Sequence, residues 1–344
     1  MAPAISVVIV NWNRRALLHS CLRAVSHQTR PAAEVIVVDN GSTDGSAAMV
    51  RAEFPHVRVL ELRENRGFAA ANNLGIRMAR GAWIALLNND TEPEPTWLEE
   101  LSRPLEQDAA VGFCASKLVR ADGSGRLDAA GDEFLTVGVA VKRGEGQPEG
   151  CYGQSDEVFG ASAAAALYRR ELFEDVGLFD EAFTPAYHED TDLNFRAQLL
   201  GYQCRYVPTA EVRHRVSATL GRQDPGVLYL RARNSWYVLV KNLPARLWMR
   251  YGVEIVVYHM AVAGYYLLVR PRGAKYLHGW LAALTMLPRL LAQRREIQRR
   301  SRLRASGVRE VLTEVGVWGA LWQQWCRRHG NRNGRSVRVN SRPE

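Results

Sequence analysis

Three carboxylates lie within four residues of one another in the segment 187–196, at Glu189, Asp190 and Asp192. The apolar residues that follow recur with helical spacing, so we expect the acids to begin a helix. Acidic side chains are favoured there by the helix dipole and can also cap the helix. A carboxylate in this place can equally take a proton from a hydroxyl group. Residues elsewhere in the chain are needed to choose between the two interpretations.

Four apolar runs in the first ninety residues each end in a polar cluster. The runs cover residues 5–10, 35–38, 57–62 and 83–87. Their aliphatic and β-branched composition is typical of strands buried on both faces. Amphipathic segments of helical length separate them, at 14–28, 46–54 and 68–80. This alternation predicts a largely parallel α/β sheet, whose ligands bind beyond the carboxyl ends of the strands, where all four clusters lie.

The polar clusters contain residue types suited to a nucleotide diphosphate bound through a metal. A diphosphate concentrates negative charge, and a hard divalent cation held by one or two protein oxygens can neutralise it. Asp90 follows the fourth run just before Pro93, and Asp39 follows the second. Both could instead be ordinary turn residues. A dinucleotide-binding domain is disfavoured, because no glycine-rich phosphate turn follows the first run.

Five blocks of sequence, in order, resemble the family 2 glycosyltransferases, which are inverting enzymes of GT-A fold. The resemblance is closest to their rhamnosyltransferase-type branch and spans residues 4 to 220. The blocks are VVIVNWNR at 7–14, VIVVDNGSTDGS at 35–46, ENRGFAAANNLGI at 64–76, ALLNNDTEPEP at 85–95, and GLFDEAF at 177–183 continued by YHEDTDLNFRAQLLGYQCRYVPTAEVRH at 187–214. Any one block is a weak signal, whereas five in this order and spacing are specific.

The resemblance implies a set of nucleotide-sugar ligands near the strand ends. Asp39 matches an acid that accepts a hydrogen bond from a pyrimidine ring. Asp90 matches the last carboxylate of the family's Asp-x-Asp metal motif, of which this chain keeps one acid. The other positions that match nucleotide-side residues are Asn11, Asn13, Asn65, Arg66, Gly67, Asn72 and Asn89.

The resemblance also assigns the metal, the base and the acceptor side. His214 matches a histidine that completes the site of a divalent metal, Mg²⁺ or Mn²⁺, together with Asp90. Asp190 matches the general base, and Glu189 and Asp192 could raise its pKa by like-charge repulsion. The small residues Gly160, Ala161 and Ser162 match a loop under the acceptor sugar, although such a run is equally typical of a tightly packed strand. The glycine-rich segment 121–157 predicts a variable loop or flap.

Charge divides the chain into an acidic and a basic part. Residues 1–220 contain 22 lysines and arginines against 30 acids, whereas residues 221–344 contain 23 against 6. Such a basic segment favours an anionic partner, either a membrane surface or a nucleic acid. A nucleic acid is disfavoured because the chain carries no nucleic-acid-binding signature.

The basic part also contains bulky apolar residues. The stretch 248–269 approaches bilayer length, but Arg250, Glu254 and His259 interrupt it, so we expect no true membrane span. Amphipathic helices lying on an anionic leaflet fit better. The residues expected at the lipid are Trp236, Trp248 and Tyr265, with Arg246, Arg250, Arg270 and Arg272. A helical subdomain packed on the core, or a homodimer surface, is the alternative.

The sequence and the resemblance together predict an α/β fold of GT-A type, a mixed nucleotide-binding sheet flanked by helices, with a basic helical extension. We expect a catalytic domain over 1–222, a helical membrane-surface region over 223–326 and a disordered tail over 327–344. The expected activity is transfer of a sugar from a dTDP- or UDP-sugar, first L-rhamnose, to a polyprenyl-linked saccharide. The expected place is the cytoplasmic face of the cell membrane. A sugar nucleotidyltransferase and an inactive nucleotide-sugar or membrane-binding module are the alternatives.

Overall fold

The computed structural model describes residues 3–215, 225–269 and 273–329. All four strands predicted in the first ninety residues are present. They are β1 (Ile5–Asn11), β2 (Glu34–Asp39), β3 (Arg58–Glu61) and β4 (Trp83–Asn88). The three predicted helices between them are present too, as α1 (Arg15–Ser26), α2 (Ser46–Glu53) and α3 (Phe68–Met78).

The second part of the sheet is mixed in direction. It contains β5 (Thr91–Pro93), β6 (Val111–Arg120), β7 (Leu127–Ala130), β10 (Asp156–Val158), β11 (Ala165–Arg169) and β12 (Gln203–His214). The strand order is β10-β12-β6-β11-β4-β1-β2-β3, with β5 paired to β12 and β7 to β6. The pairs β1–β2, β1–β4 and β2–β3 are all parallel. Strand β11 runs antiparallel to both β4 and β6. The predicted α/β sheet flanked by helices is therefore confirmed.

Both faces of the sheet are buried by helices. Alternate residues of β1 and β2 point to opposite sides, so Val7 and Val37 lie in one buried cluster while Val8 and Ile36 lie in the other. The first cluster includes α1, α2 and α4 (Trp97–Gln107), and the second includes α3, α5 (Arg170–Val176) and α6 (Glu189–Leu199). This double burial explains the continuous apolar composition of the strands.

The segment 121–157, predicted as a variable loop or flap near the site, contains short strands joined by turns. Besides β7 and β10 it contains β8 (Asp132–Leu135) and β9 (Val139–Lys142), which pair as an antiparallel hairpin. Its glycines supply left-handed turns, as at Gly131 and Gly138. These strands were not predicted, because the pairing of β7 with the neighbouring β6 and of β10 with the distant β12 is not visible in local composition.

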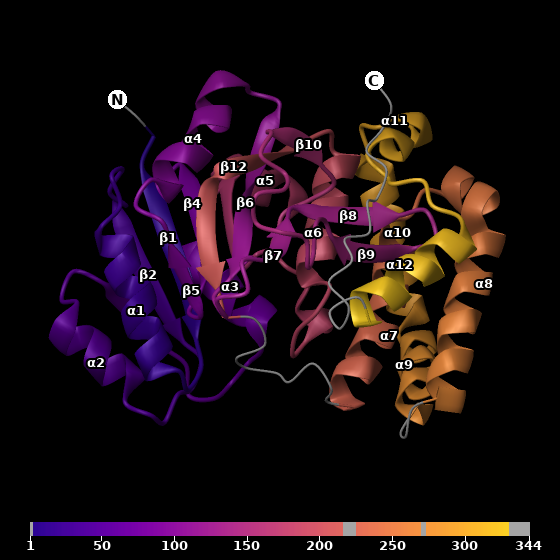
Figure 1. The fold of residues 1–344 in the computed structure, drawn as a ribbon, viewed down its shortest axis with the longest axis horizontal. Helices are drawn as coiled ribbons and strands as arrows, with labels where there is room; N and C mark the ends of the chain where they lie inside the picture. The colour runs from indigo at the N-terminus through magenta and orange to yellow at the C-terminus, as the bar shows by residue number, and fades with distance from the viewer. Residues whose placement is uncertain (1–2, 216–224, 270–272, 330–344) are drawn as a thin grey trace.

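The C-terminal part is helical, as predicted, and gathers on one side of the molecule in Figure 1. Its elements are α7 (Pro225–Asn242), α8 (Ala245–Val269), α9 (Ala274–Thr285), α10 (Leu287–Arg300), α11 (Ala305–Glu310) and α12 (Val317–His329). A buried cluster joins α7 and α8 to Phe134 of β8, to Phe183 of the short 3₁₀ helix η1 (Glu181–Phe183) and to Phe195 of α6. The helical region is thus packed directly on the part of the chain that carries the acidic cluster.

Two details of the predicted C-terminal organisation need correction. Residues 327–329 continue α12, so the tail predicted to be disordered over 327–344 does not begin at 327, and residues 330–344 lie outside the described residues. Trp236 packs against the rings of His259 and Trp280, and Trp248 and Tyr265 pack against buried clusters, so the three side chains are half-buried rather than fully exposed. Arg270 and Arg272 fall outside the described residues.

Candidate active site

The carboxyl ends of β1 and β2 are joined by a network of polar side chains. Asn11 donates to a carboxylate oxygen of Asp39 at 3.2 Å and accepts from Asn89 at 2.6 Å. The other oxygen of Asp39 accepts from the backbone N–H of Ser42 at 2.8 Å. Each carboxylate oxygen retains a further lone pair, so Asp39 can still accept a hydrogen bond from a ligand. The strand ends therefore bring Asn11, Asp39 and Asn89 together as predicted.

Asn13 and Asn72 have structural partners that account for their side chains. Asn13 adopts a left-handed conformation with φ of 50°, and its amide oxygen accepts from the N–H of Thr43 at 2.7 Å. It thereby ties the loop after β1 to the loop after β2. Asn72 is buried in α3 and donates to the carbonyl of Phe68 at 3.0 Å within the same helix. Neither contact demonstrates a ligand role, and their nucleotide assignment stays a prediction.

The predicted patch at residues 65–67 borders the chain segment that precedes the acidic cluster. Asn65 accepts from both Asn40 and the N–H of Gly67 at 2.9 Å. Gly67 has φ of +85°, and a Cβ on it would lie 2.6 Å from the hydroxyl oxygen of Thr184. Only glycine fits this close approach. Arg66 is exposed, and its backbone N–H donates to Asn40, a buried residue that the sequence analysis did not single out.

Asp90 and His214 converge as predicted. Strand β5 begins directly after Asp90 and pairs with the end of β12, so that His214 lies opposite Thr91. The Nε2 atom of His214 lies 3.4 Å from Oδ1 of Asp90. That oxygen is buried and has no hydrogen-bond partner among the described residues. An orphaned buried carboxylate oxygen facing an imidazole nitrogen is chemically suited to a cation.

Asp128 of β7 completes this end of the site and was missed in the sequence. Its Oδ2 lies 2.9 Å from Nδ1 of His214 and accepts from the Lys142 ammonium at 2.6 Å. Burial opposes charge on Asp128, but Lys142 and His214 outweigh it and hold the pKa of the carboxyl below its usual range. Burial also lowers the pKa of His214, but its contacts with Asp128 and Asp90 raise that pKa to about 8.

Asp190 lies at the start of α6, as predicted, just after a strained turn. Tyr187 and His188 just before it have positive φ angles of 81° and 68°. Such conformations are costly for residues other than glycine and persist only where neighbours enforce them. Asn234 of α7 enforces this one, because its amide donates to the carbonyls of Tyr187 at 2.7 Å and Ala186 at 3.2 Å.

Burial raises the pKa of Asp190 above the ordinary carboxyl range. The N–H groups of Thr191 and Ala163 and the charge of Lys142 oppose this rise in pKa without cancelling it. The contact with Ala163 brings the loop containing Gly160, Ala161 and Ser162 to the acid, and the acceptor role of this loop stays a prediction. Gly160 lets this loop pack on α6, since a Cβ there would lie 2.2 Å from the Asn194 amide nitrogen.

The neighbouring acids differ in their environment. Asp192 is fully buried and paired with Arg196 at 2.9 Å and with Lys241 at 2.9 Å, which lowers its pKa against the opposing effect of burial. Asp192 is not among the main influences on the pKa of Asp190, the largest of which is burial, so the expected repulsion by Asp192 stays a prediction. Glu189 does interact with Asp190, because burial first and the Asp190 charge second raise the pKa of Glu189.

Asp132, at the start of β8, is a further acid that the sequence analysis missed. Burial, followed by repulsion from Asp190, raises the pKa of Asp132 well above its usual value. Its N–H donates to the carbonyl of Gly160 at 2.8 Å, and Lys142 is its partner in the β8–β9 register. The hairpin therefore carries an acid and a cation toward Asp190.

The comparison with known proteins agrees with this geometry. The model of the family described as glycosyl transferase family 2 matches residues 6–177, half of the chain. The chain belongs to glycosyltransferase family 2.

Relatives of this family 2 chain include an N-acetylglucosaminyl-diphospho-decaprenol L-rhamnosyltransferase of Mycobacterium tuberculosis. The two are 28% identical over 270 residues, which is 72% of this chain and 87% of the relative. The chain is also 30% identical over 234 residues to the uncharacterized protein y4gI of Sinorhizobium fredii, covering 64% of this chain. It spans only a quarter of the length of y4gI, so y4gI contains much that this chain does not.

Solved structures share the GT-A fold with this glycosyltransferase. GalNAc-T7 with UDP, GalNAc and Mn²⁺ superposes with a TM-score of 0.62 and 16% identity, over 86% of this chain and 55% of that one. Residues 1–349 of TarS from S. aureus superpose with a TM-score of 0.57 and 16% identity, over 94% and 92% of the two chains. Identities this low establish the shared fold alone.

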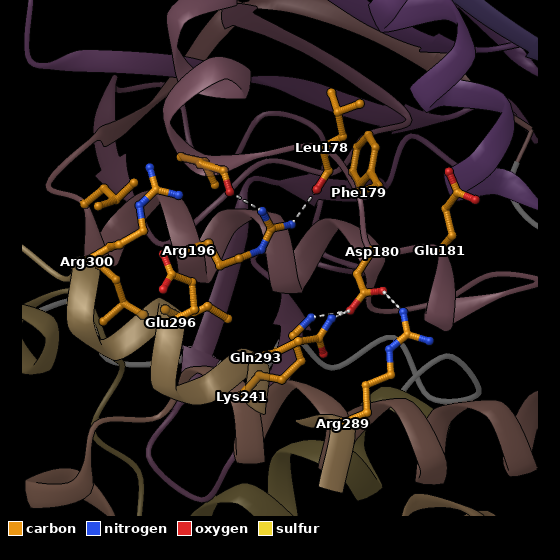
Figure 2. Close-up of a pocket in the computed structure, with 14 residues that line it drawn as sticks. Leu178, Phe179, Asp180, Glu181, Arg196, Lys241, Arg289, Gln293, Glu296 and Arg300 are labelled. Carbon is orange, nitrogen blue, oxygen red and sulfur yellow. Dashed lines mark hydrogen bonds and ion pairs between the residues drawn. The ribbon is translucent and has the colours of Figure 1, made fainter. Parts of the chain in front are cut away.

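A cavity of about 500 Å³, shown in Figure 2, is lined by residues at the C-terminal end of α6, among them Arg196 and Leu199. Several of its charged side chains are paired with one another or with backbone carbonyls. Asp180 accepts from Lys241 at 2.6 Å and from Gln293 at 2.9 Å, and Arg196 donates to the carbonyls of Val176 and Leu178. The cavity lies between α6 and α10. Neither Asp90 nor Asp190 is among the described residues that line it.

Proposed function

We propose that this chain is an inverting glycosyltransferase, with Asp190 as the general base. The observation that carries the proposal is the placement of Asp190. It is partly buried, has a raised pKa, contacts the 160–163 loop and lies within the electrostatic reach of Lys142. Lys142 in turn is linked through Asp128 and His214 to Asp90. One continuous cluster thus connects the proposed base with the proposed diphosphate end.

The reaction requires one proton acceptor and one site for a leaving diphosphate. The acceptor hydroxyl attacks the anomeric carbon of the donor, its oxygen forms the new glycosidic bond, and the bond from that carbon to the diphosphate oxygen breaks. The Asp190 carboxylate takes the hydroxyl proton, which is worth about 10²–10⁴-fold in rate. A raised pKa makes Asp190 a stronger base than an ordinary carboxylate. The 160–163 loop beside it supports the assignment of Gly160, Ala161 and Ser162 to the acceptor side.

The residues at the end of β12 fit a divalent cation, Mg²⁺ or Mn²⁺. We propose that Asp90 and His214 hold it, while Asp128 fixes the orientation of the imidazole by accepting from Nδ1. When bound, the cation neutralises the charge of the departing diphosphate. Within the described ranges, no three His, Cys, Asp or Glu side chains are grouped to hold a metal by themselves. The donor's own phosphate oxygens would therefore complete the coordination.

The proposed donor is a pyrimidine nucleotide sugar, dTDP- or UDP-linked, and the first candidate is dTDP-L-rhamnose. Asp39 supports the pyrimidine, since a buried carboxylate can accept the ring N–H of thymine or uracil. The name of the Mycobacterium tuberculosis relative supports both rhamnose and a polyprenyl-linked saccharide acceptor. The corresponding role would be in the synthesis of a cell-surface polysaccharide.

We propose a catalytic part over residues 1–222 and a helical part over 223–326 that associates peripherally with the cytoplasmic face of the membrane. The basic charge of the helical part supports an anionic surface as its partner. The boundary itself falls in 216–224, outside the described residues. A homodimer stays a prediction that no observation here favours.

A panel of nucleotide sugars tests the function directly. The chain is incubated with each donor, Mn²⁺ and a polyprenyl-diphosphate-linked saccharide, and release of nucleoside diphosphate is followed. We expect release with dTDP- or UDP-sugars and at least about tenfold weaker binding of GDP-sugars, because an unpaired buried acceptor costs about 1–3 kcal/mol. Donor binding without release would identify an inactive module, and pyrophosphate release from a nucleoside triphosphate would identify a nucleotidyltransferase.

A further inference from the structure

Exposed large apolar side chains are concentrated in the helical region. In the described part of the chain, fourteen of them lie between residues 249 and 325, whereas the sheet and its flanking helices have one, Trp12. Contiguous exposed apolar surface on a soluble protein marks a site of interaction. The largest group is on α8 and consists of Met249, Val253, Val256, Val257, Met260, Leu267, Leu268 and Val269.

Helix α8 has two apolar faces, and only one of them is packed. Residues such as Tyr251, Ile255 and Val262 lie in the buried clusters of the helical region. On the opposite face, Met249 and Val253 are each 79% exposed and Leu268 is 88% exposed. Only 28% of the most apolar 18-residue window of α8 is buried, although its mean hydropathy is 1.5. A core helix of a soluble protein would be mostly buried, so the exposed face calls for a partner.

Length and composition alone would allow α8 to cross a membrane, but its packing argues against a full span. Its buried face carries Tyr251, which donates to Glu314, and His259, which lies beside Trp236 and Trp280. Lipid on all sides would require these contacts to be broken and polar groups to face hydrocarbon. A helix embedded on one side and packed on the other keeps both sets of interactions.

Charge favours an anionic lipid surface over a second copy of this chain. Arg246 and Arg250 are exposed at the N-terminal end of the same helix, adjoining Met249 and Val253. Residues 225–269 and 273–329 together contain 16 lysines and arginines against 4 acids. Two such regions facing each other would bring like charges together, which is unfavourable, whereas anionic headgroups complement them.

We propose that the exposed face of α8 inserts into the interfacial layer of an anionic membrane, with Arg246 and Arg250 at the headgroups. This inference rests on the proposed peripheral association and names the surface that makes it. From Val253 to Val269 the face is about 25 Å long at 1.5 Å per residue, with Glu254 as its one charged residue. The binding energy then comes mainly from apolar burial, and the arginines add a part that salt screens.

Vesicle flotation tests the proposal on the full chain. Phosphatidylcholine vesicles with and without anionic phosphatidylglycerol are compared at about 0.1 M salt, where the screening length is about 10 Å, and at about 0.5 M salt, where it is about 4 Å. We expect binding to the anionic vesicles that weakens but persists at high salt. Val253→Gln with Met260→Gln should reduce it by about tenfold or more, because two exposed apolar side chains lose their burial. Glutamine keeps the helix propensity.

Leu284→Gln with Leu291→Gln is the matched control, since it removes two exposed leucines from α9 and α10. Unchanged binding by the α8 variant, or an equal loss in the control, would overturn the assignment to α8. Light scattering tests the alternative of a dimer. If the wild type is a dimer, the α8 variant is a monomer and neither protein binds vesicles, then the exposed face of α8 is a dimer interface and the membrane proposal is wrong. Donor binding, measured by calorimetry without vesicles, should be the same in the wild type and in all variants. If none of these proteins binds a donor, the proposed glycosyltransferase activity is contradicted, and the membrane proposal is judged by flotation alone.

Discussion

At the scale of single residues, the proposed general base is Asp190. Asp190→Asn keeps the shape of the side chain and removes its basicity, so kcat should fall by about 10²–10⁴-fold while donor affinity changes little. Steady-state kinetics together with donor calorimetry measure both quantities. A similar loss of donor affinity would make Asp190 a structural or nucleotide-side residue. A larger loss of kcat in Glu189→Gln would move the base to Glu189.

The raised pKa of Asp190 also predicts how the rate depends on pH. The base acts when ionised, so kcat should rise with pH through a value above the ordinary carboxyl pKa, which is about 4. The pH profile of kcat in the wild type measures this limb. The residual activity of Asp190→Asn should lack it. A limb that persists in the variant would show that another group titrates.

Asp128 should act on the metal through His214. Asp128→Asn removes the charge that orients the imidazole, so Mn²⁺ affinity, measured by titration in the presence of nucleoside diphosphate, should fall by about 10–100-fold. Asp122→Asn, an exposed acid near the same strand, serves as the control and should leave the affinity unchanged. Full activity of the wild type in EDTA would refute the metal role of both Asp90 and His214.

At the scale of elements, the junction of α6 with α7 depends on one buried cation. Lys241 is 2% exposed and pairs with Asp180 at 2.6 Å and Asp192 at 2.9 Å. Lys241→Met leaves these buried carboxylates without their main cation, so unfolding free energy should fall by about 3–5 kcal/mol in urea titrations. Arg289→Gln is the control, because Arg289 is largely exposed and 3.7 Å from Asp180, and should cost less than about 1 kcal/mol.

The same junction gives a pH dependence of stability with a definite sign. Burial opposes ionisation of Asp180, but Lys241 outweighs it and lowers the pKa to about 2; the pKa of Asp192 is lowered as well. A carboxyl group whose pKa is lower in the folded than in the unfolded state stabilises the fold at pH values above its unfolded pKa, which is about 4. This stabilisation is lost as the pH falls through the folded pKa. Wild-type stability should therefore decrease from pH 4 toward 2, and Lys241→Met should show a smaller decrease over that window.

At the scale of the whole molecule, the sheet and the helical region depend on each other. Asn234 holds the turn before Asp190, Lys241 neutralises Asp192, and one buried cluster spans α6, α7 and α8. Truncation after residue 224 should therefore abolish cooperative thermal unfolding and donor binding, and not merely transfer to a membrane-bound acceptor. A chain ending at residue 329 is the control and should retain both. Donor binding by the shorter chain would show that residues 1–224 fold independently.

The sequence by itself determined the first four strands and the polar residues that meet at their carboxyl ends. Strands β1, β2 and β4 follow from continuous apolar runs, as expected for strands buried on both faces, whereas the edge strand β3 is only partly buried. The polar residues after those runs meet because carboxyl ends of parallel strands share one edge of a sheet, which brings Asn11, Asp39 and Asn89 together. The acids at the start of α6 likewise follow from helical spacing.

Only the tertiary structure decided what each acid does. Asp190 and Asp192 are two residues apart on one helix, yet Lys241, far along the chain, neutralises only Asp192. Asp128, Asp132 and Lys142 come from a segment whose strands depend on pairing with β6 and within the β8–β9 hairpin. The tertiary structure likewise decided which apolar side chains of the helical region are buried. Trp236 packs against Trp280, whereas Val253 is exposed. Local sequence specifies an element and its periodicity, whereas charge neutralisation and burial depend on residues that meet only after folding.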